Sequence, residues 1–340
     1  MNHTQSADAV YNINKPGVRK VVGRFAPTPS GRMHLGNVFA ALIAWLGVRS
    51  ADGELVLRME DLDTQRTSAE FAQVLRQDLA WLGLDYDRET PPQSKRSRVY
   101  DRYFQILEEQ GLIYPCYCTR SQLHSVNAPH LSDGTYVYPG TCRNLTAEQR
   151  SQINRAPAWR VQVPDRLWQL EDRIQGHYEL NLFDGCGDMV MRRADGIYVY
   201  QLAVTVDDGE AGVNQVVRGT DLLSSAPRQM YLQELFGFEH PEYAHVPLLM
   251  APDGRRLSKR DRDLDLGQLR LRLSPEQLIG SLAYSCGLLE KPVIMEQRKS
   301  CHICQLSGSN LGLQIILNVI KALLNDRPVV HFAPSFHNVS

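Results

Sequence analysis

The sequence predicts an α/β protein built on a parallel sheet with helices over its faces. Strand-like apolar runs alternate with helix-spaced apolar stripes along the first hundred residues, and this alternation builds a parallel sheet with covered faces. The chain has 340 residues, of which 43% are hydrophobic and 22% are charged, enough for about two domains with a sizeable core. This composition excludes a largely disordered or collagen-like chain.

The first repeating units of strand and helix are visible in order. Residues 20–26 form a short apolar run that predicts a strand, and the proline- and glycine-rich residues 27–31 interrupt it. Helix-spaced apolar residues follow at 38–46. Residues 54–59 predict a second strand, and the apolar stripe at 71–82 predicts a second helix.

The middle and the end of the chain have a different character. Residues 100–110 predict an amphipathic helix that ends at Gly111, and the following forty residues cluster Cys, Tyr, Gly and His with little periodicity, as expected of an inserted module. Alternating apolar residues at 197–206 predict that the sheet resumes there. Residues 274–276 (Ser-Pro-Glu) predict the start of a further helix.

The charge balance and the apolar runs limit the partners and the location of the protein. Thirty-seven basic and 38 acidic side chains give a formal charge of −1, so nucleic acid would have to be met by a local patch. The first 19 residues lack the apolar core of a secretory signal. The longest apolar run, 311–324, is short for a bilayer and includes Asn318 and Lys321, which favours a buried helix. We expect a cytoplasmic protein with no membrane partner.

The first candidate site is the loop at residues 27–37, which joins a strand to a helix. Gly36 would let a ligand approach the backbone where the helix N-terminus offers N–H groups and the positive end of its dipole, which suits phosphate. Taken alone, a proline- and glycine-rich turn with an exposed His34 explains this loop equally well.

A second, basic loop at residues 255–260 (RRLSKR) could by itself be a solvated run of charge. Together, however, the two loops resemble the paired HIGH and KMSKS signatures of the class I aminoacyl-tRNA synthetases, as HLGN and RLSKR. The segments RFAPTPSGRMHLGN, LRMEDLD, VVRGTDLL and HVPLLMAPDGRRLSKR, spread from about residue 22 to 262, are similar to the glutamyl branch of that class.

The resemblance implies a Rossmann-like parallel sheet that binds ATP with Mg²⁺ and L-glutamate. Because the implied reaction joins a carboxylate to the α-phosphorus of ATP without a covalent enzyme intermediate, catalysis is expected to consist of positioning and charge stabilisation. It implies that His34 and Lys259 are catalytic. The residues implied in ATP binding are His34, Gly36, Asn37, Ser258 and Lys259.

A glutamate pocket needs guanidinium groups for two carboxylates and an acidic group for the ammonium. Each candidate alone could be an ordinary salt-bridge residue. The positions that match the glutamate-binding residues of the family are Arg24, Ala26, Thr28, Glu60, Tyr200 and Arg218. Asp207 and Asp208 are adjacent, so on a strand they could not both point to one face, and we expect structural or ribose-side roles for them.

Three cysteines crowd into the predicted inserted module. Cys116 and Cys118 can hold one ion from the same turn and Cys142 can join them, but a tetrahedral structural zinc needs a fourth ligand. Chemistry alone favours His124 or His130 over Tyr138, because a phenol is a poor zinc ligand near neutral pH. Three buried free thiols are the alternative. Resemblance to a CxC…YxxxC pattern implies one structural Zn²⁺ on Cys116, Cys118, Tyr138 and Cys142.

The other cysteines are expected to be incidental thiols. Cys301 and Cys304 flank His302 and Ile303, but no second pair of ligands lies near them in the sequence. The same expectation applies to Cys186 and Cys286.

The chain length bears on which synthetase-like activity is implied. Fewer than 80 residues follow the basic loop, too few for a large helical anticodon-binding region. The truncated relatives with the same cysteine pattern are the glutamyl-queuosine tRNA(Asp) synthetases, and the resemblance implies tRNA-independent glutamate activation followed by transfer to queuosine in the anticodon loop of tRNA(Asp). We expect a monomer.

Two alternatives stay open. A compact glutamyl-tRNA synthetase would charge the 3′ end of tRNA(Glu), and a non-catalytic module would bind RNA or an amino acid. The presence of His34, Lys259, Arg24, Glu60 and Arg218 argues against the second alternative.

We therefore expect five regions. The last fifty residues, from about 291, match nothing recognisable. The regions are a flexible tail at 1–19, the first half of a Rossmann-like catalytic domain at 20–112, a zinc-binding, acceptor-type inserted module at 113–190, the second half of the catalytic domain with its KMSKS-like loop at 191–262, and a short helical C-terminal region with an unplaced tail at 263–340.

Overall fold

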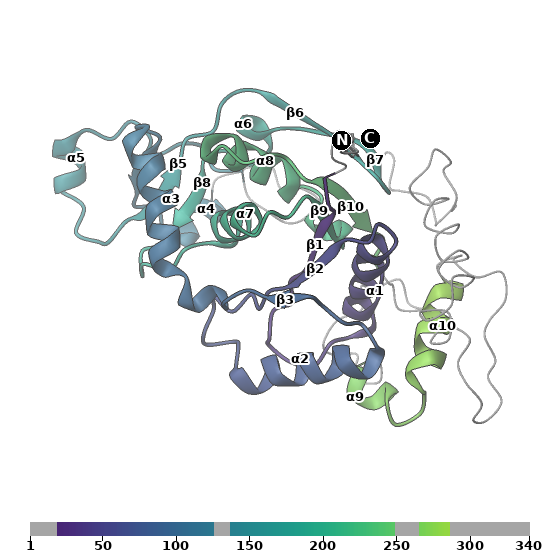
Figure 1. Ribbon diagram of the computed structural model, residues 1–340. Coiled ribbons are helices and arrows are strands. Elements are labelled where there is room, and N and C mark those ends of the chain that lie inside the picture. Colours follow the sequence, from purple (N-terminus) through teal and green to yellow (C-terminus); the bar gives the residue numbers. More distant parts are fainter. Residues whose placement is uncertain (1–18, 126–136, 249–264, 286–340) are drawn as a thin grey trace, which may run out of the picture.

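A five-stranded parallel sheet forms the centre of the fold and confirms the predicted α/β class (Figure 1). The computed structural model describes residues 19–125, 137–248 and 265–285. The strands, in their order across the sheet, are β10 (Glu242–Val246), β9 (Gln215–Gly219), β1 (Val22–Phe25), β2 (Glu54–Leu57) and β3 (Arg88–Glu89).

Helices cover both faces of this sheet, because successive residues of its strands point to opposite sides. On β9, Val216 belongs to one buried apolar cluster and Val217 to the other. One cluster includes α1 (Leu35–Arg49), α2 (Ala69–Leu82), α9 (Leu266–Leu269) and α10 (Pro275–Ser285). The other includes α3 (Ser97–Glu109), α7 (Tyr200–Glu210) and α8 (Ser225–Phe236).

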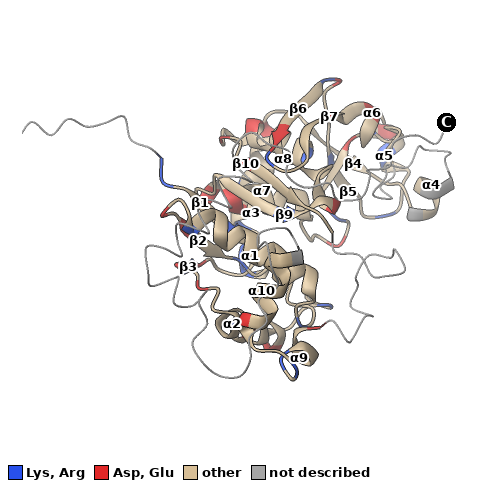
Figure 2. Ribbon diagram, turned by 90° about the vertical axis from the view of Figure 1, so that its right-hand side faces the viewer, with Lys and Arg blue, Asp and Glu red and all other residues tan. Residues whose placement is uncertain are grey.

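The segment between α3 and α7 forms smaller sheets beside the main one. An antiparallel sheet contains β4 (Ile113–Cys116), β5 (Ala158–Val161) and β8 (Met189–Arg192), and β6 (Leu167–Asp172) pairs with β7 (Gly176–Asn181) as a hairpin. The short helices are α4 (Arg120–Ser125), α5 (Ala147–Ser151), α6 (Leu182–Gly185) and the 3₁₀ turns Gln93–Lys95 and Thr220–Leu222. Figure 2 shows acidic and basic residues interspersed over the described elements in this view, in keeping with the near-zero net charge.

Local sequence signals account for where several helices begin and end. Ser68 begins α2, since its hydroxyl accepts a hydrogen bond from Phe71 N, and Gly83 ends the helix with a φ of 72°. Ser274 precedes α10 and accepts a bond from Gln277 N at 3.2 Å. The helices predicted at 38–46, 71–82, 100–110 and from 274 are confirmed, as are the strands at 20–26 and 54–59.

The strand predicted at 197–206 is wrong, because these residues lead into and form the helix α7. The seven residues from Leu202 to Asp208 are all buried, so this helix lacks the solvent-facing polar stripe that reveals a helical period. The β-branched residues Val204, Thr205 and Val206 then gave it the appearance of a strand. Asp207 and Asp208 therefore lie on a helix and not on a strand.

Several sequence-based expectations lie outside the described residues. They are the tail, whose residues 1–18 are not described, the apolar run 311–324, Cys286, Cys301 to Cys304, His130, and the basic loop with Ser258 and Lys259. Within the parts of the chain that are described, no helix combines the length and the apolar character needed to cross a membrane.

Candidate active site

Charged side chains gather where β9, β1 and β2 end, which is the edge at which open parallel sheets bind ligands. Arg24 lies on β1, Arg218 on β9, and Glu60 three residues after β2. These three strands are neighbours in the sheet, so residues as far apart in sequence as Arg24 and Arg218 come to one place. Tyr200 begins α7, which packs beneath the same region.

Arg24 is held in a buried position, with only 4% of the residue exposed. Its Nη1 donates to the Val217 carbonyl at 2.8 Å, and its Nε lies 3.5 Å from an Asp208 carboxylate oxygen. Asp208 is itself buried, and the guanidinium groups of Arg58 and Arg24 hold the pKa of its carboxyl below the usual range against the effect of burial.

Arg58 connects the acidic groups of this site. It is fully buried, and it donates from Nη1 to Asp208 Oδ1 at 2.5 Å and from Nη2 to Glu60 Oε1 at 3.1 Å. Burial raises the pKa of the Glu60 carboxyl even though Arg58 and Arg24 act in the opposite direction. Arg58 was not singled out from the sequence, although it lies inside the LRMEDLD segment.

The adjacent acids of α7 both face Arg58, which corrects the expectation that they point apart. Asp207 Oδ2 lies 3.7 Å from Arg58 Nε, and its other contacts are Gln93 Nε2 at 2.8 Å, Arg96 Nε at 2.7 Å and the Tyr100 hydroxyl. On a helix, neighbouring side chains diverge by only about 100° rather than 180°, so both can reach one guanidinium.

Arg218 is 5% exposed and is bonded through each of its nitrogens. Nε donates to His245 Nε2 at 2.9 Å, Nη1 to Gln229 Oε1 at 2.8 Å, and Nη2 to the Leu222 carbonyl at 3.3 Å. His245 was not singled out from the sequence, although it is the first residue of the HVPLLM segment.

Tyr200 lies within electrostatic range of the other predicted residues. Burial raises the pKa of its phenol, and the charges of Arg218, Glu60 and Arg24 also act on it. The structure therefore brings Arg24, Glu60, Tyr200 and Arg218 together. Of the other two predicted glutamate contacts, Ala26 directly follows β1 and is half-buried, whereas Thr28 lies in the next loop and is exposed.

His34 is the N-cap of α1. Its Nδ1 accepts a bond from Gly36 N at 3.1 Å, and Asn37 Oδ1 accepts one from His34 N at 3.3 Å. A Cβ at position 36 would lie 3.1 Å from the His34 ring, so the glycine makes room for this cap. His34 also forms a β-bridge with Asp265, where the described chain resumes after the basic loop.

The predicted metal-binding cysteines lie together. The sulfur atoms of Cys116, Cys118 and Cys142 are all within 4.8 Å of one another, and the Cys118 and Cys142 sulfurs are 3.6 Å apart. A tetrahedral zinc with bonds of about 2.3 Å separates its sulfur ligands by roughly 3.8 Å, so this cluster fits such an ion. Cys186 is buried elsewhere and bonds to the carbonyls of Leu182 and Gly187.

Tyr138 borders the cysteine cluster. Its hydroxyl accepts from Cys142 N at 2.8 Å and lies 3.4 Å from the Cys116 sulfur, while the Arg160 guanidinium stacks 3.7 Å above its ring. Burial raises the pKa of the Tyr138 phenol, so its oxygen would bind a metal as an anion only if the ion displaced the proton. His130 and the side chain of His124 lie outside what the structure describes.

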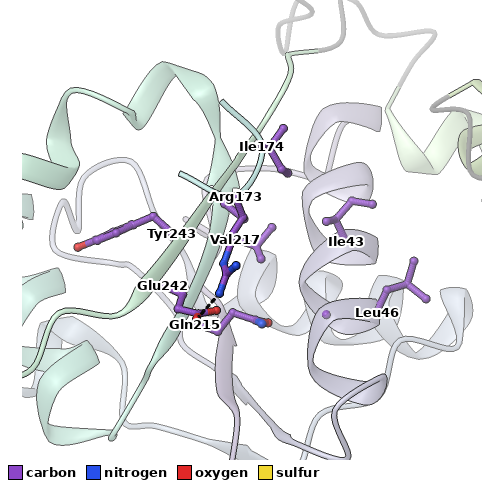
Figure 3. A pocket seen from close by; sticks show the side chains of 10 residues that line it. Ile43, Leu46, Arg173, Ile174, Gln215, Val217, Glu242 and Tyr243 are labelled. Carbon is purple, nitrogen blue, oxygen red and sulfur yellow. Dashed lines mark hydrogen bonds and ion pairs between the residues drawn. The ribbon is translucent and has the colours of Figure 1, made fainter. Parts of the chain in front are cut away.

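A mainly apolar pocket is separate from this charged site (Figure 3). It lies between α1 and the β9–β10 edge of the sheet, where Ile43, Leu46, Ile174 and Val217 contribute apolar surface. Val217 and Arg218 are consecutive on β9 and so point to opposite faces. None of the described predicted site residues lines this pocket.

The main part of the chain is similar to known proteins. Residues 20–271 match a family described as tRNA synthetases class I (E and Q), catalytic domain. A glutamyl-Q tRNA(Asp) synthetase from Nitratidesulfovibrio vulgaris is 44% identical over 281 residues, covering 78% of this chain and 86% of the relative. One of the same name from Symbiobacterium thermophilum is 45% identical over 285 residues, covering 79% and 88%.

Solved structures show the same fold. The glutamate-tRNA synthetase from Elizabethkingia anophelis superposes with a TM-score of 0.68 at 30% identity, over 78% of this chain and 61% of its own length. A glutamate tRNA ligase from Elizabethkingia meningosepticum, solved in complex with its amino acid, gives 0.67 at 30% identity, over 78% and 60%. This chain thus spans about three fifths of the length of these two proteins.

Proposed function

This chain belongs to the class I tRNA synthetases of the E and Q group, and on this basis we propose that it activates L-glutamate with ATP and transfers the glutamyl group to the queuosine base of tRNA(Asp). It is a ligase of the glutamyl-Q tRNA(Asp) synthetase type. The observation that carries the amino-acid specificity is the group of four buried side chains, Arg24, Arg58, Asp208 and Arg218, with the partly buried Glu60, at the carboxyl ends of the strands.

The charge of this group suits glutamate. The guanidinium groups of Arg24 and Arg58 pair with the carboxylates of Glu60 and Asp208, and Arg218 lies beside them, so the site offers both guanidinium donors and a carboxylate. Glutamate carries one net negative charge, and its two carboxylates match guanidinium donors while its ammonium matches a carboxylate. We assign Arg24 to the side-chain carboxylate with Arg218 supporting it, Glu60 to the ammonium, and Ala26, Thr28 and Tyr200 to the walls.

Adenylate formation needs the glutamate α-carboxylate in line with the α-phosphorus of ATP, with pyrophosphate as the leaving group. We assign His34, Gly36 and Asn37 at the start of α1 to the nucleotide, because a helix N-terminus favours phosphate. Ser258 and Lys259 complete this set. Lys259 is six residues before Asp265 in the sequence, and Asp265 forms a β-bridge with His34. Mg²⁺ bound with ATP would neutralise charge on the phosphates.

In the second step, a hydroxyl of the queuosine nucleoside in the anticodon loop attacks the mixed anhydride, and AMP leaves. We propose that residues 113–190 form the inserted, acceptor-type module, and that a structural Zn²⁺ is bound there by Cys116, Cys118, Cys142 and Tyr138. The spacing of the three sulfur atoms supports this assignment. We further propose that the protein acts as a monomer in the cytoplasm, where ATP, glutamate and tRNA are available.

The experiment that tests this function is transfer of radiolabelled glutamate to purified tRNA. Labelling of tRNA(Asp) that contains queuosine, with none of tRNA(Asp) lacking it or of tRNA(Glu), is expected. Labelling of tRNA(Glu) instead would identify a glutamyl-tRNA synthetase. Failure of glutamate to support ATP–pyrophosphate exchange, together with binding of glutamate or tRNA, would identify a non-catalytic module.

A further inference from the structure

A chain of buried polar groups connects the β6–β7 turn to Arg218. The Asp172 carboxylate accepts a hydrogen bond from His245 Nδ1 at 2.6 Å, and His245 Nε2 accepts one from Arg218 Nε at 2.9 Å. The side chains of Asp172 and His245 are fully buried. None of these contacts involves residues assigned to the nucleotide. The network reaches the proposed ligands through Arg218, which is assigned to glutamate.

The protonation of His245 follows from its two partners. The Nε–H of Arg218 can only donate, so His245 Nε2 must be an acceptor and the ring must be neutral, with its proton on Nδ1 facing Asp172. Burial and the Arg218 charge lower the pKa of His245 against the effect of Asp172, which favours the neutral ring.

The β6–β7 turn is attached firmly to β10 behind this histidine. Asp172 accepts from the backbone N–H of Ile174, Gln175 and His245, and Gln175 Nε2 donates to the His245 carbonyl at 2.7 Å. Arg173 pairs with Glu242, as Figure 3 shows. The position of His245 is therefore determined by two segments that are far apart in the chain.

Three elements together define the plane of the Arg218 guanidinium. They are β10 through His245, α8 through Gln229, and the Thr220–Leu222 turn through the Leu222 carbonyl. Among the described residues these contacts use three of its five N–H groups and leave one on each terminal nitrogen. These two N–H groups can donate hydrogen bonds to a carboxylate, but only if the guanidinium plane is held in the right orientation.

We infer that Asp172 and His245 are positioning residues that hold the Arg218 guanidinium in the orientation required for a glutamate carboxylate. The inference rests on the proposed function, because it takes glutamate as the ligand of Arg218. Neither residue touches the substrate. Their effect is expected on glutamate binding, and not on ATP binding or on the chemical step.

Two substitutions at one position separate this role from a purely structural one. In His245→Asn the amide can still donate to Asp172 from near the place of Nδ1 but cannot reach Arg218. In His245→Gln the amide oxygen lies near the place of Nε2 and can still accept from Arg218. His240→Asn, on the exposed histidine two residues before β10, is the control.

The measurement is ATP–pyrophosphate exchange with glutamate varied and then with ATP varied, together with thermal melting. For His245→Asn we expect KM for glutamate to rise about tenfold or more, with kcat and KM for ATP close to wild type and a lower melting temperature, because a buried donor of Arg218 loses its acceptor. His245→Gln and His240→Asn should retain KM for glutamate within about threefold. Should His245→Asn fail to fold, His245→Met, which also lacks a strong acceptor, takes its place in the comparison with His245→Gln.

The inference is overturned if KM for glutamate in the Asn or Met variant equals that of the wild type. It is also overturned if KM for glutamate rises as much in the Gln variant as in the Asn variant, because the histidine would then serve only the fold. A rise in KM for ATP of the same size also overturns it. Absence of glutamate-dependent exchange in the wild-type protein would instead refute the proposed function.

Discussion

Replacing Arg24 with glutamine should reduce the preference of the enzyme for glutamate over glutamine. The two amino acids are nearly isosteric and differ in the charge at the end of the side chain. Discrimination therefore depends on the Arg24 guanidinium, which pairs with the carboxylate of glutamate but has no charged partner when glutamine binds. Arg24 is 4% exposed, and solvent therefore screens it little. Loss of one partner of a buried charged pair costs about 2–5 kcal/mol, which corresponds to roughly 30-fold or more in kcat/KM for glutamate.

The fold should survive this change, because Asp208 keeps its bond to Arg58 at 2.5 Å when Arg24 is removed. The assay is ATP–pyrophosphate exchange with each amino acid, and the expected result is a large loss with glutamate and a small loss with glutamine. Arg24→Lys, which keeps the charge but not the two-pronged geometry, should lie between the wild type and the glutamine variant. Equal losses with both amino acids would refute the assignment and place Arg24 in the ATP site or the fold.

Three further predictions test the surrounding groups. Because burial raises the pKa of Glu60, its carboxylate should be protonated at a higher pH than an ordinary glutamate, and KM for glutamate should rise as the pH falls toward that raised pKa; a KM that stays flat down to the ordinary pKa of a glutamate side chain would contradict the contact of Glu60 with the ammonium. Arg58→Met removes the hydrogen bonds that Arg58 donates to Asp208 and Glu60 and should lower the free energy of unfolding by about 3–5 kcal/mol in urea denaturation, whereas Arg66→Met, on an exposed arginine, should leave it nearly unchanged. About one atom of zinc per chain should co-purify with the wild-type protein, and Cys142→Ser should lose the zinc and melt at a lower temperature. Metal-free wild-type protein would mean that the cysteines are free thiols. Full zinc retention in Tyr138→Phe would mean that Tyr138 is not a ligand.

The sequence by itself was enough to predict the fold class and to place most of the charged residues at the ends of strands. The strands that hold Arg24 and Glu54 are short apolar runs bounded by glycine and proline, and helices such as α2 carry an apolar stripe, a serine cap and a terminal glycine. These signals are local, so neighbouring residues suffice to produce them. The assignment of Arg24, Glu60, Tyr200 and Arg218 to glutamate came from family motifs and stays a proposal.

Only the tertiary structure decided how the charged residues are paired. Arg58 joins Glu60 to Asp208, and His245 joins Arg218 to Asp172, over separations of up to 150 residues. A lone arginine or histidine in a sequence carries no sign of its partner, because the partner is set by which strands lie side by side in the sheet. The helix α7 escaped detection for a related reason, since burial on all sides removes the polar stripe by which a helix is recognised.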